Sequence, residues 1–179
     1  MISDHDRDRL LKLARETIEA YVGAAPAHVP AASGVLDEPR GAFVTLHKHG
    51  ELRGCIGHIE PNEPLGKVII RCAVAAASTD PRFPPITPGE LEDIDIEISL
   101  LTPLEEIHGS GDVEVGRHGL VVEQGWQRGL LLPQVATEWH WDAEMFLAHT
   151  CHKAGLPKDA WKHGAKIYRF EAEVFGESD

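Results

Sequence analysis

Mostly hydrophobic residues near the start of the chain recur every three or four positions, which is the spacing of one helix face. The residues of this stripe are Leu10, Leu13, Ala14, Thr17, Ile18 and Tyr21. Ser3 precedes the stripe, with Asp6 three positions later, and a serine in this place can cap the first turn. The pattern predicts an amphipathic helix that ends near Val22. The Ala- and Pro-rich stretch 23–40 after it is typical of a connecting loop.

Two short strand-like runs follow, at 43–46 and 51–56. They flank a turn that uses Gly50, and they predict an antiparallel hairpin. The segment 61–64, which begins and ends with proline, then opens a second helix, since proline is tolerated in a first helical turn. The apolar stripe of that helix comprises Leu65, Val68, Ile69, Cys72, Ala73 and Ala76. Residues 94–100 alternate again and predict a half-buried strand.

The second half of the chain contains shorter signals. Residues 119–122 and 129–132 are strand-like runs on either side of a glycine-containing turn, and they predict a second hairpin. Asp142 can cap a helix that ends just before Gly155. The final alternation, over 166–174, predicts one closing strand.

Together these elements predict an α+β fold. Helices alternate with hairpins, and the spacing typical of parallel βαβ units does not occur. We expect a larger lobe in which helices pack on a mostly antiparallel sheet. A smaller lobe that contains the second hairpin is expected at about 109–141, inserted within the larger one, with a cleft between the two lobes.

The composition is that of a folded protein. The chain has 179 residues, of which 42% are hydrophobic and 26% charged, so it can bury a core. The start of the chain is densely charged, and no apolar run approaches the length that spans a bilayer. We therefore expect no signal peptide, no membrane partner and a cytoplasmic location. Three cysteines without CxxC spacing fit free thiols in a reducing compartment.

The charge balance is strongly acidic. Seventeen Lys and Arg residues against 29 Asp and Glu residues give a net charge of −12. Such a surface repels long nucleic acid and anionic membrane, so neither is an expected partner. The stretch between Arg82 and Arg117 contains no Lys or Arg and predicts an acidic face. The segment 149–169 is comparatively basic, so a local basic site is compatible with the composition.

The segment Leu52-Arg53-Gly54-Cys55-Ile56-Gly57-His58 is the strongest candidate for a functional site. On a strand, Arg53, Cys55 and Gly57 lie on one face. A guanidinium beside a thiol favours the thiolate, and neighbouring glycines let a ligand approach the sulfur. A short junction to the second helix would bring the N-terminus of that helix, with its free backbone donors, close to Arg53 and Cys55. The structural alternative is that Cys55 is packed and the glycines mark tight packing.

Two other groups of residues have chemical potential. The metal-capable residues near the second capped helix are His140, His149, Cys151 and His152. Their spacing matches no standard zinc motif, so surface or capping histidines are the simpler interpretation. Trp139 and Trp141 can stack on a base or aromatic substrate, or they can anchor the core. Because no Walker loop, dinucleotide fingerprint, EF-hand or iron–sulfur cysteine run occurs, we expect no metal and no cofactor.

Several ordered blocks of the sequence carry a resemblance. The first block is Gly41-Ala42-Phe43-Val44-Thr45-Leu46, followed by Gly50-Glu51-Leu52-Arg53-Gly54-Cys55-Ile56-Gly57. The later blocks are Asp80-Pro81-Arg82-Phe83-Pro84-Pro85, Ile98-Ser99-Leu100-Leu101, Gly119-Leu120, and Gly129-Leu130-Leu131-Leu132-Pro133-Gln134-Val135. These blocks resemble the AMMECR domain family, whose prokaryotic members are called AmmeMemoRadiSam system protein A. Since the likeness covers nearly the whole chain, 1–179 is expected to form a single AMMECR-type domain.

The resemblance implies an α+β fold with a larger and a smaller lobe, in which residues 52–57 line the cleft side of the larger one. Proteins of this family co-occur with a Memo-family protein and a radical S-adenosylmethionine enzyme, which implies a shared modification pathway with these two as partners. The radical cluster would belong to the partner. His58 departs from the small hydroxyl or other non-basic residue that is expected after the motif.

Three functional hypotheses follow. In the first, the chain is an enzyme or enzyme subunit: the Cys55 thiolate is a nucleophile or covalent carrier, and Arg53 holds an anionic group of a small or nucleotide-like substrate. The residues that would complete this pocket are Gly54, Gly57, Asp80, Arg82 and Gln134, with His58 or His140 moving protons. In the second, a non-catalytic module binds a nucleotide, an RNA end, a peptide or the Memo-type partner, and Cys55 only packs. In the third, the motif builds a tight hairpin without a ligand.

Overall fold

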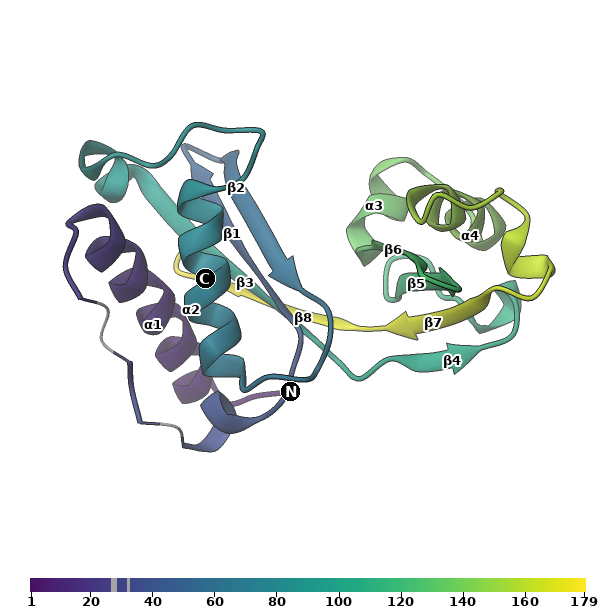
Figure 1. The fold of residues 1–179 in the computed structure, drawn as a ribbon, viewed down its shortest axis with the longest axis horizontal. Coiled ribbons are helices and arrows are strands. Elements are labelled where there is room, and N and C mark those ends of the chain that lie inside the picture. The colour runs from purple at the N-terminus through teal and green to yellow at the C-terminus, as the bar shows by residue number, and fades with distance from the viewer. Residues whose placement is uncertain (27–28, 32) are drawn as a thin grey trace. The chain divides into compact units, whose positions relative to one another are not determined.

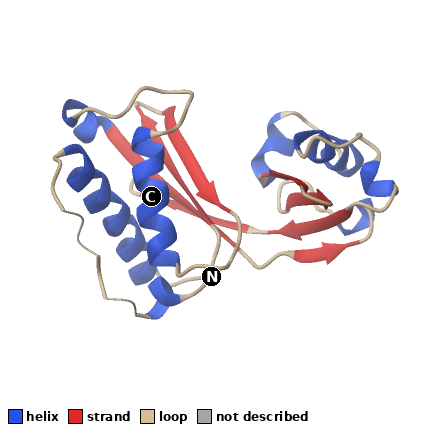
Figure 2. Cartoon of the chain, viewed as in Figure 1, coloured by secondary structure: helices blue, strands red, loops and turns tan. Residues whose placement is uncertain are grey.

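A computed structural model of the chain describes residues 1–26, 29–31 and 33–179. It has an α+β fold with two four-stranded antiparallel sheets packed by helices, as the sequence predicts (Figure 1, Figure 2). The chain divides into two compact units. Unit 1 comprises Met1–Leu101 and Glu173–Asp179, and unit 2 comprises Thr102–Ala172. Among the described residues, no helix is both long enough and apolar enough to cross a membrane.

In unit 1, two helices cover one face of a sheet (Figure 1). The sheet order is β2 (Glu51–His58), β1 (Ala42–Lys48), β3 (Ile94–Leu101) and β8 (Ala172–Gly176). The helices are α1 (Asp4–Val22) and α2 (Leu65–Ser78), and the 3-10 turns are η1 (Gly34–Asp37) and η2 (Pro88–Asp93). Ser3 caps α1, because its hydroxyl accepts a hydrogen bond from the Asp6 backbone N–H at 3.1 Å.

The predicted elements of unit 1 are confirmed: the first helix, the first hairpin, the second helix and the strand at 94–100. The predicted loop 23–40 contains η1. Residues 27, 28 and 32 of that loop lie outside the described residues.

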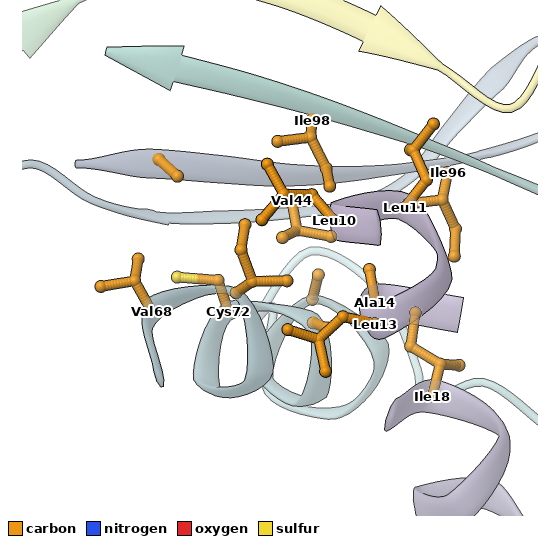
Figure 3. Packing of buried hydrophobic residues seen from close by; sticks show 14 of the residues in the cluster. Leu10, Leu11, Leu13, Ala14, Ile18, Val44, Val68, Cys72, Ile96 and Ile98 are labelled. Carbon is orange, nitrogen blue, oxygen red and sulfur yellow. The ribbon is translucent and has the colours of Figure 1, made fainter. Parts of the chain in front are cut away.

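The core of unit 1 fills the space between α1, α2 and the sheet face that they cover. Figure 3 labels Leu10, Leu11, Leu13, Ala14, Ile18, Val44, Val68, Cys72, Ile96 and Ile98 in this cluster, and all of them are buried. Successive strand residues point to opposite faces, so Val44 and Ile98 enter the core while Thr45 and Glu97 point to the other face. Cys72 is a core residue, as predicted, and its side chain cannot reach a ligand.

Strand β2 lies closely against α2 at Gly54. A Cβ atom at this position would overlap the backbone carbonyl oxygen of Ala76 in α2. Since every other residue carries a Cβ, only glycine allows this approach. Gly57 is restricted on the opposite face, where a Cβ would overlap the ring of Phe43 on β1. Both glycines of the motif therefore have steric reasons to be there.

Unit 2 packs two further helices on a second sheet. The sheet order is β4 (Glu105–Ile107), β7 (Lys166–Phe170), β5 (Gly119–Gln124) and β6 (Gln127–Leu131). The other elements are η3 (Ser110–Asp112), α3 (Pro133–Glu138), α4 (Ala143–Lys153) and η4 (Ala160–Lys162). Asp142 caps α4 by accepting a hydrogen bond from the Met145 backbone N–H at 2.8 Å. The predicted second hairpin and capped helix are confirmed, whereas the short helix α3 was not predicted, since six residues show no helical stripe.

One prediction about the end of the chain is wrong. The closing strand expected over 166–174 is two strands, β7 and β8, which belong to different sheets. The break lies at Glu171, whose backbone N–H donates to Thr102 Oγ1 and whose carbonyl accepts from the Thr102 N–H, both at 2.8 Å. Alternation of side chains continues across this break, so the sequence pattern could not show it. The expected smaller lobe, 109–141, lies inside unit 2, and its boundaries and the cleft stay predictions.

The steric requirement at Gly54 gives a first prediction. We expect Gly54→Ala to lower the free energy of unfolding by about 1–3 kcal/mol, since the added methyl group must push α2 away from the sheet. Urea unfolding followed by circular dichroism measures this change. Gly89→Ala is the matched control, because nothing lies within 4 Å of a Cβ at that position. Equal stability of the two variants would contradict the steric assignment.

Candidate functional site

Cys55 lies on β2, at the edge of the unit 1 sheet, directly opposite Thr45 of β1. The Thr45 hydroxyl and the Cys55 sulfur are 3.2 Å apart and share a hydrogen bond. The backbone of Cys55 points outward from the sheet edge. Its N–H donates to Asp80 Oδ2 at 3.0 Å, and its carbonyl accepts from Arg82 Nη2 at 3.4 Å. The Asp80 and Arg82 side chains thus form hydrogen bonds with backbone groups that have no partner strand at this sheet edge.

Asp80 and Arg82 form a tight ion pair beside Cys55. The carboxylate accepts hydrogen bonds from Arg82 Nε at 3.0 Å and Nη2 at 2.7 Å, and from the Arg82 backbone N–H at 3.1 Å. These bonds, first of all those from the guanidinium, hold the pKa of Asp80 well below its usual range. The Asp80 side chain is 2% exposed and that of Arg82 is 54% exposed, so the accessible member of the pair is the cation.

Arg53 has a different partner from the one the sequence suggests. Its Nε and Nη2 donate to the two carboxylate oxygens of Glu90, at 3.1 and 3.2 Å, and Nη2 also donates to the Pro85 carbonyl at 3.3 Å. Lys48 Nζ donates to the same Glu90 carboxylate at 3.0 Å. Hydrogen bonds from Arg53 and then from the Thr87 backbone lower the pKa of Glu90 to about 2. Arg53 therefore fixes the loop before β3 onto β2.

The thiol of Cys55 is half-buried, and this burial raises its pKa. The hydrogen bond from Thr45 and the charge of Arg82 act in the opposite direction, and the charges of Asp80 and Glu97 add to the rise. The net direction favours the neutral thiol at neutral pH. Thiolate chemistry at Cys55 consequently has no support from this environment.

The expected anion corner at the start of α2 is a wrong prediction. Gly54 meets Ala76, close to the C-terminal end of α2, so Cys55 lies near the end of the helix and not near its beginning. The reason is that α2 runs back along β2 after the junction, which puts the strand residues far from the junction beside the last turns of the helix. The first N–H of α2, from Leu65, donates to the Glu38 carbonyl at 2.9 Å.

The remaining candidate residues are distributed over the chain. His58 ends β2, and its Nε2 is 2.9 Å from Asn62 Oδ1. Gln134 belongs to α3 and His140 follows that helix, both in unit 2. Thr45 and Glu90 were missed by the sequence analysis. Counting the hairpin register back from Gly50 would have paired Cys55 with Val44, because a bulge between Leu46 and His47 shifts the register by one residue, so the sequence did not show Thr45. The Thr87-x-x-Glu90 capping pattern could have pointed to Glu90.

The aromatic and histidine cluster of unit 2 is a ring stack. Trp141 and His149 lie parallel with centroids 3.9 Å apart, and Trp139 lies 6.3 Å from Trp141. Trp139 is 67% exposed, so it does not anchor the core. Cys151 is fully buried. Within the described part of the chain, no three His, Cys, Asp or Glu side chains are grouped so that they could hold a metal ion.

Comparison with known proteins defines the class of this fold. The family model AMMECR1 matches residues 11–175. A protein of Methanothermobacter thermautotrophicus is 51% identical over 94% of this chain and 92% of its own length, and one of Methanocaldococcus jannaschii is 47% identical over 93% and 88%. The crystal structure of an uncharacterized protein from Pyrococcus horikoshii matches with a TM-score of 0.88 and 44% identity, covering 98% of this chain and 93% of that one. The chain belongs to the AMMECR1 family.

The raised pKa of Cys55 predicts the pH dependence of its alkylation. Because only the thiolate reacts, we expect the rate with iodoacetamide to rise at a pH above the ordinary thiol value of about 8.5. Mass spectrometry of the Cys55 peptide reads the rate, with the core residues Cys72 and Cys151 as internal controls that react only on unfolding. A midpoint well below 8.5 would instead show a resting thiolate.

Asp80 should contribute strongly to stability. We expect Asp80→Asn to lower the free energy of unfolding by about 2–3 kcal/mol at pH 7, since charge-assisted bonds are lost and Arg82 loses its partner. Because folding lowers the pKa of Asp80, its contribution is present above the unfolded value of about 3.9 and is lost as the pH falls below it. The difference in the free energy of unfolding between wild type and variant should therefore become smaller at acidic pH. Asp37→Asn, at an exposed position, is the control, and an equally small effect of both changes would contradict the assignment.

Proposed function

We propose that unit 1 binds an anionic group at the surface formed by Thr45, Cys55 and Arg82, here called the Cys55 surface. The observation that supports this most directly is the position of Arg82. Its guanidinium forms a hydrogen-bonded ion pair with the buried Asp80 carboxylate, yet more than half of the Arg82 side chain is exposed. No described residue accepts a hydrogen bond from Arg82 Nη1, so the Nη1 amino group is available to a ligand.

The Cys55 surface is preorganised for such a ligand. Arg82 is fixed by Asp80 and by the Cys55 carbonyl, and its guanidinium carbon lies 5.5 Å from the centre of the Phe83 ring. A guanidinium that is already ordered loses little freedom when it binds a carboxylate or phosphate, and it presents its N–H groups in a planar fork. The neutral thiol of Cys55 can add a weak hydrogen bond beside it.

This assignment favours binding over nucleophilic catalysis. A resting thiolate needs an environment that lowers the thiol pKa, whereas burial raises it here. In this proposal Cys55 is a packed and partly accessible member of the binding surface. Arg53, occupied by Glu90, holds the loop that carries Arg82 and does not contact the ligand.

The family resemblance supplies a context for the ligand. We propose that the protein serves the modification pathway in which a Memo-family protein and a radical S-adenosylmethionine enzyme also act. The anionic group would then belong to a small or nucleotide-like molecule of that pathway, or to an acidic side chain of a partner protein.

Two alkylating reagents of different charge test the Cys55 surface. Iodoacetate is anionic and iodoacetamide is neutral, and both modify the same sulfur. We expect the iodoacetate-to-iodoacetamide rate ratio at Cys55 to exceed that of a thiol in the unfolded chain, because a cation a few ångströms away is worth about 1 kcal/mol at a wet surface. Arg82→Gln should lower this ratio about threefold to tenfold.

The matched control is Arg71→Gln, which removes an equally exposed arginine that forms an ion pair with Glu63 on another part of unit 1. Arg82→Lys, which keeps the charge, should retain most of the ratio. If Arg82→Gln and Arg71→Gln change the ratio equally, the anion-binding assignment is wrong. A pH profile of the iodoacetamide rate in the same samples shows whether the thiol pKa has changed with the variant.

A further inference from the structure

A small polar pocket in unit 2 lies outside the Cys55 surface. Its volume is about 150 Å³, and all the residues that line it belong to unit 2. They are Thr102, Pro103, Glu105, Arg117, His118, Arg169, Phe170 and Glu171. Polar and charged side chains dominate this list, so the pocket fits a hydrophilic ligand of a few heavy atoms.

His118 is the buried polar group of this pocket. The residue is 7% exposed, and its Nδ1 accepts a hydrogen bond from the Glu114 backbone N–H at 2.9 Å. An imidazole nitrogen that accepts a hydrogen bond carries no proton, so in the neutral ring the proton is on Nε2. Nε2–H is then a donor, and no described residue accepts from it. This nitrogen is not fully buried, so its N–H stays open to solvent and can donate to a ligand.

The two arginines of the pocket are held in place by carboxylates. Arg169 donates Nε and Nη2 to Glu105 at 3.2 and 2.9 Å and Nη1 to the Asp112 carbonyl at 2.7 Å. Arg117 pairs with Glu171 through Nε and with Glu114 through Nη1. The lining charges of Arg117, Arg169, Glu105 and Glu171 balance. The donors for which no described residue is an acceptor are Nε2–H of His118 and the remaining N–H groups of Arg117.

The charge environment keeps His118 neutral. Burial lowers its pKa, and the nearby charges of Arg169 and Arg117 lower it further, against the charges of Glu171 and Glu114. The lowered pKa favours the neutral ring, in which Nδ1 accepts and Nε2–H is a donor.

We propose that this pocket binds a small oxyanion, a carboxylate or a phosphate group, with the Nε2–H of His118 and the N–H groups of Arg117 as its donors. An oxyanion supplies acceptors to these donors, and it is small enough to enter a cavity of about 150 Å³. The site is separate from the Cys55 surface, and either can exist without the other.

The test uses nitrogen-15 histidine labelling of the full chain and NMR of the His118 ring. Titration with inorganic phosphate and with acetate, at constant ionic strength held by chloride, distinguishes the two sources of the oxyanion. We expect a saturable shift of the His118 Nε2 resonance with at least one of them. The absence of a saturable shift with both would overturn the proposal, and this result needs no variant.

Two variants separate the ligand contact from the structural contact. In His118→Asn the amide oxygen takes the place of Nδ1 and keeps the Glu114 contact, but the Nε2 donor is gone. We expect it to weaken binding of the effective probe about tenfold or more, measured from backbone amide shifts of Gly119 and Phe170. His152→Asn, at an exposed histidine outside the pocket, should leave binding unchanged. Equal affinities of wild type and His118→Asn would overturn the role of His118.

Discussion

The buried carboxylate of Asp80 is the interaction on which the candidate site depends. It accepts hydrogen bonds from the backbone of Cys55, from the backbone of Arg82 and from the Arg82 guanidinium, and it has almost no contact with water. A buried charge is stable only when it is paired and hydrogen-bonded. Here the bonds from Arg82 order the loop after α2, and the bond from the Cys55 N–H joins that loop to the exposed edge of β2. The position of Arg82 and the hydrogen bonding of the sheet edge both follow from this one group.

The motif that looks most like a reaction centre is largely explained by packing and by this edge closure. Gly54 is required by the approach of α2, and Gly57 by the ring of Phe43. Arg53 is engaged by Glu90, which also binds Lys48 and the Thr87 backbone. What remains for a ligand is the exposed guanidinium of Arg82 beside a neutral thiol. A signature of this kind can therefore describe a scaffold that presents a neighbouring residue, rather than residues that react themselves.

In both units, carboxylates hold arginine side chains in place. In unit 1 a carboxylate beneath Arg82 orients the cation, and in unit 2 Glu105 and Glu171 orient Arg169 and Arg117. Ordered guanidinium groups with spare N–H donors are suited to oxyanions, although the chain as a whole carries a net charge of −12. The overall acidity disfavours binding of long polyanions, while single arginines held in place by carboxylates can still bind small anions.

The sequence by itself determined the family, the α+β class and most of the elements, because helix stripes, strand alternation and capping residues are local properties of the chain. It also brought Asp80, Arg82 and Cys55 into one hypothesis through the ordered blocks. Only the tertiary structure decided which charges meet. Arg53 and Cys55 are two positions apart on β2, yet Glu90 binds the guanidinium of Arg53, and Arg82 is the cation whose charge acts on the sulfur. Only the tertiary structure also shows that β7 and β8 belong to different sheets, whereas the sequence pattern predicted one continuous strand. Which distant residues pair depends on how the loops and helices fold back onto a strand. The spacing of residues along the sequence does not contain this information.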